Sequence, residues 1–193
     1  QEFVGWSSLN WRILRPDQIR ELYQKKELET GFYSSRSFDD CICRLIQRGL
    51  VAEGCGDTEV QALYRLLSDL YIMPISENLL LRLCSFFRLC VFGNVPYSTA
   101  KKIFCKDKRT ADEKKVIRLA KQTLLSTAEI IKCFERNKLD FCCDEELLDT
   151  LYYDEFTTSD NIADMVSYLP ECRPVMLSVA NLYLRKQIIF ERI

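Results

Sequence analysis

The segment SSRSFDDCICRLIQRGLV, residues 34–51, decides the fold that we expect for the first half of the chain. Its apolar residues recur at intervals of three and four, which places them on one face of an α-helix: Phe38, Cys41, Ile42, Leu45 and Ile46. Ser34, Ser35 and Ser37 are candidate N-caps. Gly49 stands where many helices end in a residue with positive φ. The pattern therefore predicts one amphipathic helix with a defined start and end.

A helix and a turn are predicted before this segment. Two strands are also predicted, one that begins at the end of the segment and one that follows it. Residues 16–27 predict a helix that begins with a proline, which suits a first helical turn, and a Gly-containing turn follows at 29–31. Residues 50–51 begin an apolar strand, 54–57 form a turn, and 62–67 supply the returning strand. Helix, turn, helix and a two-stranded wing is the resulting order.

The stretch from Ser37 to Val51 resembles the recognition helix of winged helix-turn-helix transcriptional regulators of the multiple-antibiotic-resistance and PadR-like kinds. The match rests on the apolar spacing before Gly49 and covers roughly residues 16–67. The resemblance implies that the helix enters the major groove of double-stranded DNA, with Arg36 as the main base or phosphate contact. The DNA-contacting residues that it implies are Ser35, Arg36, Ser37, Arg44 and Gln47.

Acidic residues in the same region favour a second hypothesis. Asp39 and Asp40 lie in the expected recognition helix, and residues 53–59 hold three further acids with no Lys or Arg. Carboxylates near phosphates weaken DNA binding, because DNA is a dense line of negative charge. The alternative to a DNA-binding regulator is therefore a non-catalytic protein-interaction or adaptor module on a winged-helix scaffold.

The composition describes an ordinary globular chain that is rich in helix-forming residues. Of 193 residues, 48% are hydrophobic and 28% charged, and 27 basic residues nearly balance 28 acidic ones. Only 6 Gly and 5 Pro favour a mostly α-helical fold over one with many tight turns. The longest apolar stretch, residues 79–92, is interrupted by Arg82 and Arg88, so we expect no membrane span and a cytoplasmic location.

The cysteines and the absence of histidine limit the catalytic, redox and metal sites that the chain can form. We expect the 10 Cys to be reduced and to act mainly as small hydrophobic residues, with Cys142 and Cys143 as the redox or metal candidates. With no His, the chain cannot form a Ser-His-Asp triad, a Cys-His dyad or a histidine zinc site. No phosphate-binding glycine loop is present either. We therefore expect no enzyme activity, no metal and no cofactor.

The second half predicts an all-helical domain. We place the boundary after residue 75, which gives a winged-helix-like domain at 4–75 and a helical domain at 76–193 for dimerisation, partner binding or ligand binding. The expected helices cover residues 76–92, 98–105, 110–136, 145–153, 159–168 and 174–192. A basic run at 101–121 is either a surface for an anionic partner or a solvated helix face, and the second interpretation is favoured. A homodimer is one expected state.

Overall fold

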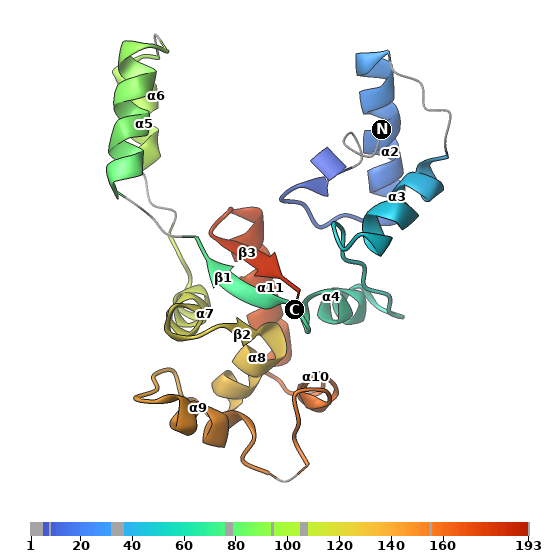
Figure 1. The fold of residues 1–193 in the computed structure, drawn as a ribbon, viewed down its shortest axis with the longest axis vertical. Coiled ribbons are helices and arrows are strands. Elements are labelled where there is room, and N and C mark those ends of the chain that lie inside the picture. The colour runs from blue at the N-terminus through green and yellow to red at the C-terminus, as the bar shows by residue number, and fades with distance from the viewer. Residues whose placement is uncertain are drawn as a thin grey trace.

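The computed structural model describes residues 6–7, 9–31, 37–75, 79–93, 95–104, 108–154 and 156–192. Over these ranges the chain is mostly helical, as predicted, with helices α2 to α11 and one small antiparallel sheet (Figure 1). The first part contains α2 (Pro16–Thr30), α3 (Phe38–Gln47), α4 (Glu59–Leu67), β1 (Tyr71–Pro74), α5 (Leu79–Val91), α6 (Tyr97–Ala100) and the 3-10 helix η1 (Lys101–Phe104). The second part contains α7 (Ala111–Gln122), β2 (Leu125–Ser126), α8 (Thr127–Glu135), α9 (Asp144–Leu151), α10 (Ile162–Val166), α11 (Cys172–Leu184) and β3 (Ile188–Glu191).

Helix α3 forms where the sequence predicted an amphipathic helix. Ser37 is its N-cap, and the Ser37 hydroxyl accepts a hydrogen bond of 3.1 Å from the backbone N–H of Asp40. Gly49 has a φ of 67°, the left-handed conformation that ends helices. Cys41 and Leu45 are buried, so the apolar face predicted from the spacing packs inward. Candidate caps Ser34 and Ser35 lie outside the described residues.

The predicted wing is wrong, because its returning strand is a helix. Residues 59–67 form α4, which begins at Thr58, whose hydroxyl accepts a hydrogen bond of 3.2 Å from the backbone N–H of Gln61. Residues 50–58 form no strand. Gly54 lies in this segment, where a Cβ would collide with backbone atoms of α4. The glycines that predicted a hairpin turn instead allow the loop to pack closely against a helix.

The sheet joins segments that are distant in the sequence. Its strand order is β2-β1-β3, and both pairings are antiparallel. Ile72, in the central strand, lies opposite Leu125 of β2 and opposite Phe190 of β3. β1 therefore precedes the boundary expected after residue 75, but among the described residues its pairing partners are two strands that follow that boundary. The boundary itself stays a prediction.

The prediction of an all-helical second half is wrong at two places. The helix expected at 110–136 is two helices, α7 and α8, separated by β2. Ser126 starts α8 with a capping box, in which its hydroxyl accepts from the backbone N–H of Glu129 at 3.2 Å and its own N–H donates to the Glu129 carboxylate at 2.7 Å. The last helix ends at Leu184 rather than at residue 192, because Lys186 takes a φ of 58° and the apolar residues after it pair with β1.

The hydrophobic core lies between the sheet and helices α7, α8 and α11. α11 packs against α7 and α8 and also meets α4 (Figure 1). The largest side chains at the centre have almost no exposed surface: Leu67, Ile72, Leu119, Leu125, Ile130, Ile131, Met176, Leu182 and Ile188. Their burial is the main favourable contribution to folding. None of the helices in the described ranges is long and apolar enough to cross a membrane.

Candidate interaction surfaces

The residues expected to contact DNA are only partly brought together on α3. Arg44 and Gln47 are both exposed and lie three residues apart, which places them on one side of the helix. Ser37 is exposed, but its hydroxyl is already engaged, because it also donates to the Asp40 carboxylate at 2.8 Å. Ser35 and Arg36 lie outside the described residues.

The start of α3 is acidic. Asp39 accepts a hydrogen bond of 2.9 Å from Arg20 of α2, and the Arg20 guanidinium lies 5.4 Å from the centre of the Phe38 ring. These contacts attach α2 to α3, and the two carboxylates favour helix formation at this end. The same end is the one that a recognition helix presents to base edges, so Asp39 and Asp40 disfavour DNA binding there.

A helical projection, which we call the arm, is formed by residues 79–104. It comprises α5, α6 and η1, and Figure 1 shows it extending away from the sheet. The ring of Phe86 faces inward, with its centre 5.7 Å from that of Tyr97 and 5.3 Å from that of Phe104. Ala100 is buried beside them. The arm thus packs its inner face on itself, with α5 against α6 and η1.

The outer face of the arm exposes apolar side chains beside positive charge. Leu83, Phe87 and Val91 recur every four residues on α5 and are 45%, 56% and 65% exposed. Arg88 is exposed next to Phe87 and makes no ion pair with the residues that the structure describes. Residues 79–104 contain four Lys and Arg and no Asp or Glu. Contiguous exposed apolar surface of this kind is typical of docking sites.

A second surface, which we call the acidic lobe, is formed by residues 139–171. This segment contains ten Asp and Glu and no Lys or Arg, and it carries α9 and α10. Asp144, Glu145 and Asp149 of α9 are exposed and form no ion pair within the described ranges. The lobe also exposes large apolar side chains: Leu148, Tyr153, Phe156, Met165 and Tyr168. It therefore combines one sign of charge with exposed aromatic rings, as the arm does with the opposite sign.

We call the sheet with α7, α8 and α11 the body, and two ion pairs attach the acidic lobe to one edge of it. Asp140 pairs with Arg118 of α7, and Glu146 pairs with Lys138 at 2.9 Å. Glu146 also accepts a hydrogen bond of 2.7 Å from the backbone N–H of Cys142, and this bond is the main reason why the pKa of Glu146 is lowered. These contacts use Asp140 and Glu146 and leave the other carboxylates of α9, those of Asp144, Glu145 and Asp149, facing solvent.

The lobe's connecting loop is ordered by its own polar groups. The Asp154 carboxylate accepts hydrogen bonds from the backbone N–H and the hydroxyl of Thr157, at 2.7 and 2.5 Å. These bonds lower the pKa of Asp154. Phe156, within this turn, is 80% exposed. Phe156 is thus exposed to solvent within a turn that the Asp154–Thr157 hydrogen bonds close.

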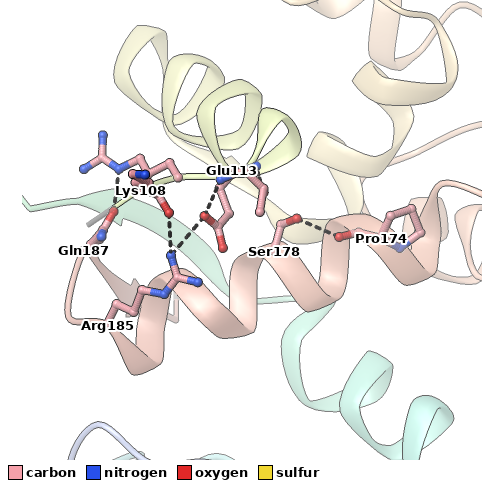
Figure 2. Close-up of polar contacts among 8 residues, drawn as sticks. Lys108, Glu113, Pro174, Ser178, Arg185 and Gln187 are labelled. Atoms are coloured by element: carbon pink, nitrogen blue, oxygen red, sulfur yellow. Dashed lines mark hydrogen bonds and ion pairs between the residues drawn. The ribbon is translucent and has the colours of Figure 1, made fainter. Parts of the chain in front are cut away.

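A buried carboxylate joins the start of α7 to the end of α11 (Figure 2). Glu113 has no exposed surface, and its Oε2 accepts from the backbone N–H of Thr110 at 2.8 Å and from Nη1 of Arg185 at 3.2 Å. Arg185 also donates to the carbonyl of Lys108 at 3.3 Å. The other Glu113 oxygen, Oε1, has no hydrogen-bond partner among the described residues. The cluster holds the start of α7 against the end of α11, which is a structural role.

An apolar cavity of about 260 Å³ separates the first residues from the body. The ring centre of Tyr183 lies 5.3 Å from that of Trp11 and 4.9 Å from that of Phe190. Among the described residues that line the cavity there is no acid, cysteine or serine. It is a packing gap between the N-terminal segment, α4 and β3.

The cysteines within the described ranges are free thiols. Burial raises the pKa of Cys133 to about 12 and also raises that of Cys172, which keeps both thiols protonated and unreactive. Cys142 and Cys143, the sequence's redox or metal candidates, are exposed. In the part of the chain that the structure describes, no three metal-ligating side chains converge.

No protein-family model matches the chain, and no curated protein or solved structure is significantly similar to it. Any functional argument therefore rests on its own residues. The sequence analysis missed the arm and the acidic lobe, although both are visible as long runs with one sign of charge. It missed them because a near-neutral total charge conceals this segregation.

Proposed function

We propose that the protein is a non-catalytic interaction module that docks an acidic, partly apolar partner surface on the outer face of the arm. The observation that carries the proposal is the exposed stripe of Leu83, Phe87 and Val91, flanked by Arg88 on a segment without any acid. Aromatic and arginine side chains are enriched at the centres of protein interfaces. Single-sign charge around them selects a partner of opposite sign and speeds the encounter.

The proposal is tested with a labelled helical peptide of Glu and Leu, and with a Lys and Leu peptide of equal length as the comparison. Fluorescence anisotropy with the full chain measures both affinities. Phe87→Ser should weaken binding of the acidic peptide by about tenfold or more, as loss of a central aromatic contact does. Val60→Ser, which changes an apolar residue of α4 that is 44% exposed, is the control and should have no effect. Equal binding of the two peptides, or unchanged affinity of Phe87→Ser, would contradict the proposal.

Binding of duplex DNA is the second candidate, and the topology of the second half supports it. β2 lies between α7 and α8, β3 follows α11, and the three helices pack around a three-stranded sheet, an order that resembles a winged helix. Residues 172–187, which cover α11 and the turn after it, hold three basic residues and no acid. Under this proposal α11 rather than α3 is the main DNA-contacting helix.

Duplex DNA of mixed sequence, titrated at low and moderate salt, tests the second candidate. Binding should weaken steeply with salt, and Arg173→Ala, which removes an exposed cation of α11, should lower the salt slope by about one charge. Arg44→Ala is the parallel variant on α3, and it tests the helix that the sequence favoured. Absence of binding at low salt removes this candidate and leaves the interaction module.

A further inference from the structure

We propose that the arm of one copy of this chain docks on the acidic lobe of a second copy, so that copies associate head to tail. The inference rests on the proposed function of the arm as a docking surface, and it names the partner. It requires that the two surfaces complement each other in charge and in apolar character, and that they cannot meet within one molecule.

The charges of the two surfaces are opposite and unmixed. The arm has four Lys and Arg and no acid, whereas the lobe has ten Asp and Glu and no base. Arg88 of the arm and Glu145 of the lobe are exposed, and neither forms an ion pair within the described ranges. Complementary potentials of this kind bring surfaces together and fix their orientation.

The apolar side chains on both surfaces are of the type that anchors interfaces. The arm exposes Phe87 and, at 83%, Phe92, while the lobe exposes Phe156 and, at 92%, Tyr168. Aromatic side chains, Phe included, are enriched at the cores of protein interfaces, and arginine stacks favourably on their faces. Each surface thus holds aromatic anchors surrounded by charges that the other can pair.

The two surfaces lie at opposite ends of the molecule. Figure 1 shows the arm at the upper left and α9 and α10 at the bottom, with the sheet and α11 between them. Contact within one chain is therefore excluded in this structure, and docking must join two copies. Pairing of one arm with another arm is disfavoured, because it places Arg88 and Lys101 against equal charges.

A contact between two different surfaces has a structural consequence. Each copy keeps one surface open after the first contact, so the association closes into a ring or continues as a filament. The association should also weaken with salt, since the exposed charges are screened within about 10 Å at 0.1 M salt.

Sedimentation velocity of the full chain over a range of concentrations tests the inference. The arm variant carries Phe87→Ser and Arg88→Glu, and the lobe variant carries Glu145→Lys and Phe156→Ser, all at exposed positions. Each variant alone should raise the dissociation constant of self-association by about tenfold or more. An equal mixture should form a discrete dimer, because one variant keeps an intact lobe and the other an intact arm. Circular dichroism verifies that both variants are folded.

The outcomes separate this inference from the proposed function. If the wild type self-associates but the mixture of arm and lobe variants forms no dimer, the interface lies elsewhere and the inference is overturned. A wild type that stays monomeric while the Glu and Leu peptide binds the arm also overturns it, and leaves the docking function standing. If the wild type neither self-associates nor binds the Glu and Leu peptide, both proposals are contradicted. Binding of the arm to anionic lipid vesicles, without self-association, would replace the second copy with a membrane surface.

Discussion

The body around α11 and the arm differ in whether their apolar side chains are buried and whether their charged side chains are paired. In the body, Ile130 has no exposed surface and the carboxylate of Glu113 is paired with Arg185. In the arm, Phe87 is more than half exposed, and Arg88 lies in solvent without an ion pair among the described residues. Apolar burial and paired charge contribute to stability, whereas apolar exposure beside unpaired charge is available for binding. The comparison therefore distinguishes residues that stabilise the fold from residues that are available to bind a partner.

The largest difference is expected from truncating one apolar residue in each region. Ile130→Ala should lower the free energy of unfolding by about 2–5 kcal/mol, because it leaves a cavity in the core. Phe87→Ala should change it by less than about 0.5 kcal/mol, as exposed substitutions usually do. Urea unfolding of both variants measures the contrast. Similar losses in the two variants would mean that the arm is part of the cooperative core.

Breaking the buried ion pair should have the next largest effect. Arg185→Met leaves the fully buried Glu113 carboxylate without its cation and should cost about 2 kcal/mol, since Arg185 itself is partly exposed and the pair is partly screened. Lys186→Met removes the neighbouring exposed cation and is the matched control. Equal stability of the two variants by urea unfolding would show that the Glu113 contact contributes nothing.

Helix capping should contribute less. Ser126→Ala removes the hydroxyl that caps α8 and should lower the free energy of unfolding by about 1 kcal/mol. Ser85→Ala changes an exposed serine inside α5 and is the control, for which we expect almost no loss. A loss of the same size in Ser85→Ala would show that hydroxyl removal in itself, rather than the cap, is being measured.

The smallest expected effect is a pH dependence of stability, which arises from the buried thiol of Cys133 in the body. Burial raises the pKa of Cys133 from 9.0 to about 12, so the folded state favours the neutral thiol. This contribution to stability is complete at pH 7 and is lost progressively as the pH rises through 9 towards 12. At pH 9 the loss should be about 0.4 kcal/mol. The urea midpoint of wild type should therefore fall more between pH 7 and 9 than that of Cys133→Ala; parallel curves would contradict the assignment.

Part of the candidate interaction surface could have been predicted from the sequence. The unbroken charge sign of the arm and of the lobe is a property of sequence order, and counting acids and bases by segment finds it. The exposure of Phe87 could not be predicted, because the apolar pattern of α5 suits a helix that is covered on all sides equally well. Only the packing of α5 against α6 and η1 determines which of its faces remains uncovered.

The sequence by itself determined the local elements whose signals lie within a few residues. Ser37 and Gly49 delimit α3 because capping bonds and a left-handed glycine act over three or four residues. The tertiary structure alone decided the sheet, since β1 at 71–74 pairs with β3 at 188–191. It also decided that Glu113 meets Arg185, 72 residues away. Such contacts depend on which surfaces remain to be buried after the helices form, and no local pattern records that.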